Sequence, residues 1–169
     1  MSGEEIPERE LLVLFEAARW APSCFNAQPW RMLYARRGAD HWPVFLNLLS
    51  PANQVWAQAA AALVVWLSKR TFEHNGKPNT THSFDAGAAW ENLALQGTLR
   101  GHVVHGMAGF DYERARVELG VPDDFQVEAM AAIGRPAGTE VLPEDLRKKE
   151  EPSSRRPLAG TICEGRFRL

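Results

Sequence analysis

The sequence has few cysteines, no marked excess of either charge and no long apolar run. Its two cysteines, Cys24 and Cys163, exclude a disulfide framework and are typical of a reducing compartment. Nineteen Lys and Arg against 21 Asp and Glu give a net charge of −2, which disfavours binding to nucleic acid or to an anionic membrane surface. The longest apolar stretch, residues 57–67, contains Gln58 and is shorter than the about 20 residues that cross a bilayer. Residues 1–10 are acidic and lack the order of a signal peptide. We therefore expect a soluble, cytoplasmic protein with no nucleic-acid and no membrane partner.

The composition is that of a folded globular domain. Hydrophobic residues make up 45% and charged residues 24% of the 169 residues, so a disordered or fibrous chain is excluded. At about 150 residues per domain, the length predicts one domain over residues 1–169. From residue 135 onward the chain is rich in Pro, Glu, Lys and Arg, and residues 150–169 are expected to form an extended tail.

Hydrophobic periodicity predicts an irregular mixture of helices and strands. Helices are expected at 8–20, 44–49, 53–60, 83–99, 112–119 and 144–149, strands at 31–36, 61–68, 102–107 and 127–134, and loops at 24–29 and 74–81. In the longest helix Ser83 is expected as the N-cap. Phe84, Ala88, Leu95 and Leu99 form an apolar stripe, joined by Ala89, Leu93 and Ala94. Because helices and strands do not alternate regularly, the fold class is predicted to be α+β.

Common catalytic and metal-binding patterns do not occur. The sequence contains no Gly-x-Ser-x-Gly elbow, no zinc-binding pair among its five histidines and no glycine-rich phosphate loop. A nucleophilic Cys24 paired with a histidine stays open as a weak alternative to a small residue in a tight loop. No metal site is expected.

One loop has unusual chemistry. Residues 22–30, Pro-Ser-Cys-Phe-Asn-Ala-Gln-Pro-Trp, combine a hydroxyl, two side-chain amides, two prolines and two aromatic rings. Prolines restrict the backbone, so that the amides can be held at set angles. The loop could recognise the edge of a flat heterocycle, although an ordinary turn with capping amides has the same composition.

These residues resemble a known family. Residues 17–23, Ala-Ala-Arg-Trp-Ala-Pro-Ser, followed by Asn26-Ala27-Gln28-Pro29-Trp30, look like the signature of the nitroreductase family of FMN-dependent oxidoreductases. Further blocks that resemble the family follow in its order: Asn53 with Trp56, 85–96, 107–111, 132–136 and 155–158. The first block is specific, and the others add weight together.

The resemblance implies a fold, a cofactor and a reaction. It implies an α+β homodimer with a mostly antiparallel sheet flanked by helices, and two FMN sites at the dimer interface. FMN would pass hydride from NAD(P)H to a small-molecule electron acceptor such as a nitroaromatic or a quinone, in a ping-pong cycle. The exposed apolar surface expected for the dimer includes Phe25 and Trp30. The chemistry would take place on the flavin, so no catalytic side chain is expected.

The resemblance also assigns cofactor contacts, residue by residue. Pro22, Ser23 and Cys24 would lie against the isoalloxazine, with Asn26 and Gln28 nearby. Asn53 would face the pyrimidine edge, and the backbone at Ala108 and Gly109 would meet the N5/O4 edge. Arg155 and Arg156 would hold the phosphate, because the planar guanidinium donates bidentately.

Two departures from the family concern the cofactor. Relatives usually carry a basic segment before the first helix, whereas residues 1–10 contain only Arg9. Trp56 stands where many relatives have a lysine. Two alternatives therefore stay open, a protein that binds flavin or another small ligand without turnover and a partner-binding subunit without a ligand.

Overall fold

The computed structural model describes residues 1–167, which fall into two compact units, residues 1–138 and the chain from Thr139 onward. The first unit contains the sheet and all the long helices. The second contains short turns: a 3₁₀ turn at Thr139–Val141, α6 at Glu144–Arg147 and a 3₁₀ turn at Leu158–Gly160. A single domain over 1–169 stays a prediction.

A four-stranded antiparallel sheet forms the centre of the first unit. Its strands are β1 (Trp30–Arg36), β2 (Ala62–Lys69), β3 (Val103–Met107) and β4 (Phe125–Gly134), in the order β1-β2-β4-β3. The central strand β2 is buried from Ala62 to Ser68, as its continuous apolar sequence predicts. At the edge, β3 ends at Met107, opposite Met130, so β4 extends beyond it.

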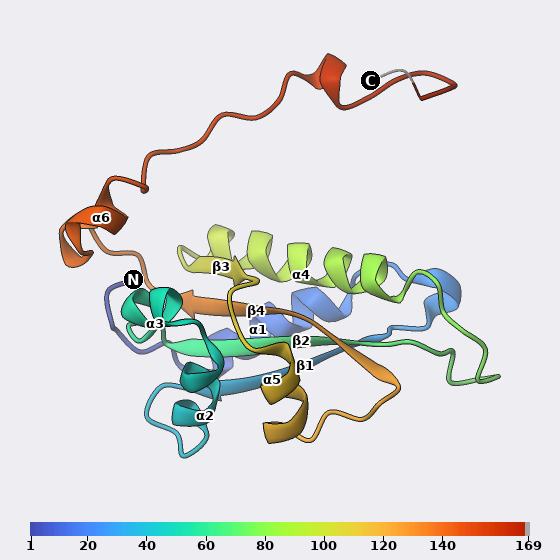
Figure 1. Cartoon of the computed structure of the whole chain (residues 1–169), viewed down its shortest axis with the longest axis horizontal. Helices are drawn as coiled ribbons and strands as arrows, with labels where there is room; N and C mark the ends of the chain where they lie inside the picture. The colour runs from blue at the N-terminus through green and yellow to red at the C-terminus, as the bar shows by residue number, and fades with distance from the viewer. Residues whose placement is uncertain (168–169) are drawn as a thin grey trace. The chain divides into compact units, whose positions relative to one another are not determined.

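Helices cover both faces of the sheet (Figure 1). They are α1 (Glu8–Arg19), α2 (Trp42–Leu48), α3 (Pro51–Ala57), α4 (His82–Leu99) and α5 (Tyr112–Glu118). Alternate residues of β2 point to opposite faces. Val64 and Trp66 pack with α1 and α4, whereas Leu63, Val65 and Leu67 pack with α2, α3 and α5. The α+β class and the antiparallel sheet flanked by helices are confirmed.

The expected cap of the longest helix is wrong. Thr81, not Ser83, occupies the N-cap position of α4, and no side chain there makes a capping hydrogen bond. The Ser83 hydroxyl instead donates to Glu128 across on β4, 2.7 Å away. Ser83 lies inside the first turn of α4, and its hydroxyl bonds to the sheet instead of capping the helix. The loop expected at 24–29 also contains a short 3₁₀ turn, Cys24–Asn26.

The expected apolar stripe of α4 is divided between two faces: Ala89 and Leu93 are buried, whereas its other large members face outward. Phe84 and Leu99 are 81% and 83% exposed and Leu95 is 54% exposed. The residues that α4 buries against the sheet are mostly small: Asp85, Ala86, Ala89, Leu93 and Gly97. At Gly97 a Cβ would come within 2.5 Å of Val104, so the helix lies close on the sheet with its bulkier apolar side chains left outside. No helix within residues 1–167 is long and apolar enough to cross a membrane.

Candidate functional site

The loop of residues 22–28 is tied to the first turn of α4. The backbone N–H of Cys24 donates to Oδ2 of Asp85, 3.1 Å away, and the backbone N–H of Gln28 donates to the hydroxyl of Ser23 at 3.0 Å. Asp85 is only 4% exposed. The structure thus brings the predicted residues Pro22, Ser23, Cys24, Asn26 and Gln28 together in one fixed loop.

The loop backbone is strained. Phe25, Asn26 and Gln28 have φ values of 51°, 54° and 46°, in the left-handed region that side chains other than glycine rarely adopt. Such a conformation persists only when surrounding contacts hold it, and the bonds to Asp85 and Ser23 supply them. The Phe25 side chain is 83% exposed, whereas Trp30, expected on the same surface, is 4% exposed and belongs to the core. The prediction of an exposed Trp30 is therefore wrong.

A second group of predicted residues lies where the chain leaves β3. Asn53 on α3 donates from Nδ2 to the carbonyl oxygen of Gly109 at 3.0 Å, and the backbone N–H of Ser50 donates to the same oxygen at 2.9 Å. A Cβ on Gly109 would come within 2.7 Å of Asn53 Nδ2, so a larger residue at this position would displace the Asn53 side chain. Asn53, Ala108 and Gly109 are therefore neighbours.

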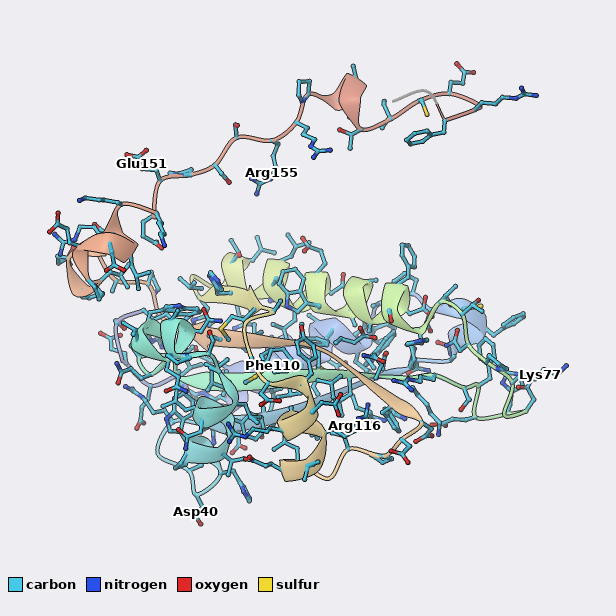
Figure 2. All side chains as sticks on the ribbon, in the orientation of Figure 1. Asp40, Lys77, Phe110, Arg116, Glu151 and Arg155 are labelled. Atoms are coloured by element: carbon cyan, nitrogen blue, oxygen red, sulfur yellow. The ribbon has the colours of Figure 1, made fainter. Side chains whose placement is uncertain are left out.

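The first two groups lie on different parts of the sheet. Figure 1 shows α3 at one end and the segment that follows α1 at the other. Arg155 and Arg156 belong to the second unit and are exposed. Within that unit the Arg155 guanidinium, labelled in Figure 2, donates to the carbonyl and hydroxyl of Ser153, both at 3.1 Å.

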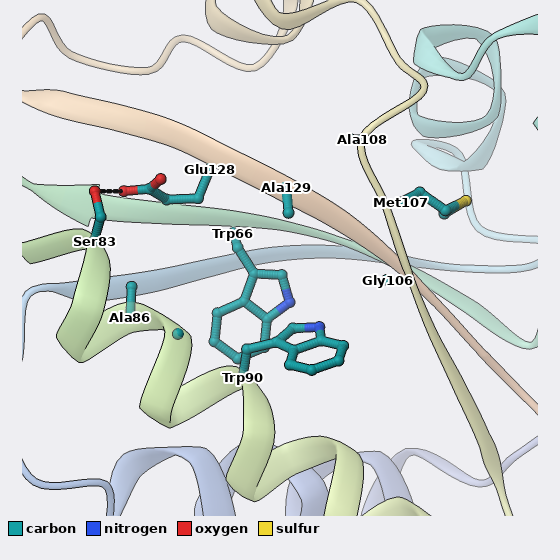
Figure 3. A pocket seen from close by; sticks show the side chains of 10 residues that line it. Trp66, Ser83, Ala86, Trp90, Gly106, Met107, Ala108, Glu128 and Ala129 are labelled. Carbon is teal, nitrogen blue, oxygen red and sulfur yellow. Dashed lines mark hydrogen bonds between the residues drawn. The ribbon is translucent and has the colours of Figure 1, made fainter. Parts of the chain in front are cut away.

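A cleft of about 390 Å³ opens between α4, β4 and the segment after β3. Its lining residues are Trp66, Ser83, Ala86, Gly87, Trp90, Gly106, Met107, Ala108, Glu128 and Ala129. The size is within the range of about 300–1,000 Å³ typical of small-molecule sites. Figure 3 shows Ser83 and Glu128 at one end of the cleft and Gly106, Met107 and Ala108 at the other.

Two indoles form part of the apolar wall. Trp66 comes from β2 and Trp90 from α4. At Gly106 a Cβ would press to 2.9 Å on the Trp90 ring, so the glycine lets β3 pass close to it. Within residues 1–167, the buried Nε1 of Trp66 has no hydrogen-bond acceptor. A buried donor without a partner is uncommon in folded proteins.

The end of the cleft opposite Ala108 is polar. We call it the polar corner, and it is made of Ser68, His82, Ser83 and Glu128. Glu128 Oε1 accepts hydrogen bonds from the hydroxyls of Ser68 and Ser83. Ser68 has one hydroxyl proton, which goes to Glu128, so its 2.7 Å contact with His82 requires a proton on Nδ1 of the imidazole. The polar corner therefore holds a carboxylate in a fixed position, with its side chain 23% exposed.

Sequence reasoning identified one residue of this cleft, Ala108, and missed its walls. Trp66 looked like any core residue in an apolar strand, and Ser83 looked like a cap. Glu128 gave no local signal because its partners lie 45 and 60 residues away. Only the pairing of β2 with β4 and the packing of α4 bring these side chains together.

Comparison with known proteins connects the whole chain to one fold. The sequence profile of the nitroreductase family matches residues 2–49. A crystal structure described as an oxidoreductase containing FMN is 46% identical, with a TM-score of 0.95 over 99% of this chain and 86% of that one. An uncharacterised 15.4 kDa protein of Mycolicibacterium smegmatis is 29% identical, over 81% of this chain and 97% of its own length. An NADH dehydrogenase of Thermus thermophilus is 28% identical, over 79% of each chain.

Proposed function

The chain belongs to the nitroreductase family, and on that premise we propose that it is an FMN-dependent oxidoreductase that oxidises NAD(P)H. The observation that carries the proposal is the likeness, over 99% of this chain, to an oxidoreductase that contains FMN. The NADH dehydrogenase among the relatives supports a nicotinamide donor. Nitroaromatics, quinones and similar small molecules are the proposed electron acceptors.

The residues of the cleft fit a flat, mostly apolar ring. Its walls are largely aromatic, alanine and glycine, and its volume of about 390 Å³ is within the range of small-molecule sites. We propose that Pro22, Ser23, Cys24, Asn26 and Gln28 lie against the isoalloxazine. The other proposed contacts are Asn53 at the pyrimidine edge, the backbone of Ala108 and Gly109 at the N5/O4 edge, and Arg155 and Arg156 at the phosphate.

When bound, FMN would supply the hydride chemistry between NAD(P)H and the acceptor. The chain's own residues would bind the flavin and orient it. The backbone at Ala108–Gly109 would stabilise negative charge at the edge that it meets, since main-chain N–H groups held in place do so without reorganisation. The bond from Asn53 to the Gly109 carbonyl fixes this segment, and the two indoles give the cleft an apolar wall.

We propose further that the site is shared between two copies of the chain. The outward stripe of α4, Phe84, Leu95 and Leu99, supports this, because an exposed apolar face of this kind marks an interaction surface. The location of the 22–28 loop and the Asn53–Gly109 group on different parts of the sheet also supports it. The loop of one copy would complete the site at Asn53 of the other.

Steady-state kinetics test the reaction. NAD(P)H oxidation should require FMN and an acceptor, with parallel double-reciprocal lines when both substrates are varied, the pattern of a ping-pong cycle. Flavin binding without any turnover would instead favour a binding protein of the same fold. A protein that takes up no FMN at all would favour the partner-binding alternative.

Mixing variants tests the shared site. Asn26→Ala and Asn53→Ala homodimers should each bind FMN weakly. A mixed dimer of the two variants concentrates both changes in one site and leaves the other intact. Mixing should therefore restore about one tight site per mixed dimer. If mixing restores nothing, each site lies within one chain.

A further inference from the structure

We propose that Glu128 makes the cleft select uncharged or cationic aromatic acceptors against anionic ones. The inference rests on the proposed function and adds a substrate class to it. Among the described residues that line the cleft, Glu128 is the one charged side chain. It lies in the polar corner, at the end away from Ala108 (Figure 3).

The carboxylate is fixed rather than free to turn away. Ser68 is fully buried, and its hydroxyl and that of Ser83 both donate to Oε1 of Glu128. His82 Nδ1 lies 3.6 Å from the same oxygen and, by its bond to Ser68, is held beside it. Both serines bond to Oε1 of this carboxylate, which lines the cleft.

The other walls of the cleft favour an aromatic ligand. Trp66 and Trp90 provide apolar aromatic surface, which suits a flat ring. With the flavin edge at Ala108, as proposed above, an acceptor ring lies in the rest of the cleft. If its reducible group points toward Ala108, its opposite substituent points toward Glu128.

A negative substituent at that position meets a like charge. Two unit charges about 6 Å apart at an effective dielectric of about 40 repel by about 1.4 kcal/mol, which is about tenfold in affinity. An amide at the same position can donate to the carboxylate. The matched probes are therefore 4-nitrobenzamide and 4-nitrobenzoate, which share a ring and a nitro group and differ by one charge.

Equilibrium dialysis of the FMN-saturated protein against each probe measures the ratio of the two Kd values. The measurement is made at pH 8. We expect 4-nitrobenzoate to bind about tenfold more weakly than 4-nitrobenzamide. In Glu128→Gln, which keeps an oxygen for both serines, the ratio should fall below about threefold.

Glu113→Gln is the matched control. It removes the same charge from an exposed residue of α5, which covers the opposite face of the sheet, and should leave the ratio near tenfold. A ratio that survives in Glu128→Gln, or failure of both probes to bind the parent, overturns the inference. Dialysis contains no NAD(P)H, so a protein that binds the probes without reducing them counts against the proposed function alone.

Discussion

Asp85 should hold the 22–28 loop in its strained conformation. Replacing it with alanine removes the acceptor for the Cys24 N–H at 3.1 Å and for the Thr81 hydroxyl at 3.2 Å. A hydrogen bond to a charged group contributes about 1.5–3 kcal/mol. Thr81 has one hydroxyl proton and can give it to Asn79 Oδ1, 3.0 Å away, so only the bond from Cys24 is lost outright.

The expected loss follows from those contacts. Asp85→Ala should lower the free energy of unfolding by about 2–3 kcal/mol, close to one charged hydrogen bond. Asp85→Asn keeps an acceptor oxygen and should lose about 1 kcal/mol. Urea denaturation followed by tryptophan fluorescence gives both values, and amide hydrogen exchange reports the Cys24 N–H directly.

The control is Asp40→Ala, which removes an exposed carboxylate labelled in Figure 2 and should change stability by less than about 0.5 kcal/mol. Cys24 exchange in Asp85→Ala should be faster than in the parent by more than the global loss of stability explains, because the loop opens locally. Unchanged stability and unchanged Cys24 exchange would refute the role of Asp85. FMN affinity should fall along with loop protection if the loop contacts the flavin.

Three other variants test separate parts of the proposal. Cys24→Ser should leave the rate of flavin reduction by NAD(P)H, measured by stopped flow, within a few-fold of the parent. A thousandfold loss would instead support Cys24 as a nucleophile. Arg156→Ala should weaken FMN binding at least tenfold in a fluorescence titration, since a charge-assisted bond to phosphate contributes about 1.5–3 kcal/mol; Lys149→Ala, in the same unit, should not. Leu99→Glu should give monomers in sedimentation, because a two-fold interface places each change twice, whereas Val117→Glu on α5 should leave the dimer intact.

Much of the fold could be predicted from the sequence because local patterns and tertiary contacts agree. The continuous apolar run of β2 became the central strand, and the periodic segments became α1, α4 and α5 within a few residues. Periodicity alone cannot say which apolar face meets the core. On α4 Leu93 and several small residues pack against the sheet, whereas Phe84 and Leu99 face out.

The site was less predictable, for a physical reason. The 22–28 loop could be recognised from the sequence because its predicted site residues lie within seven consecutive positions. The cleft is built from β2, α4, β3 and β4, and the hydrogen bonds to Glu128 come from residues 45 and 60 positions away. Glu128 becomes notable only through the serines that reach it from other elements. A single sequence does not show which residues from distant elements come into contact.

An anaerobic absorption spectrum tests the central claim most directly. The protein is mixed with one equivalent of FMN, then with NADH or NADPH, then with a nitroaromatic or a quinone. We predict a flavin spectrum perturbed from that of free FMN, which bleaches with at least one of the two donors and returns when the acceptor is added. A spectrum that stays identical to free FMN and does not bleach with either donor would contradict the account.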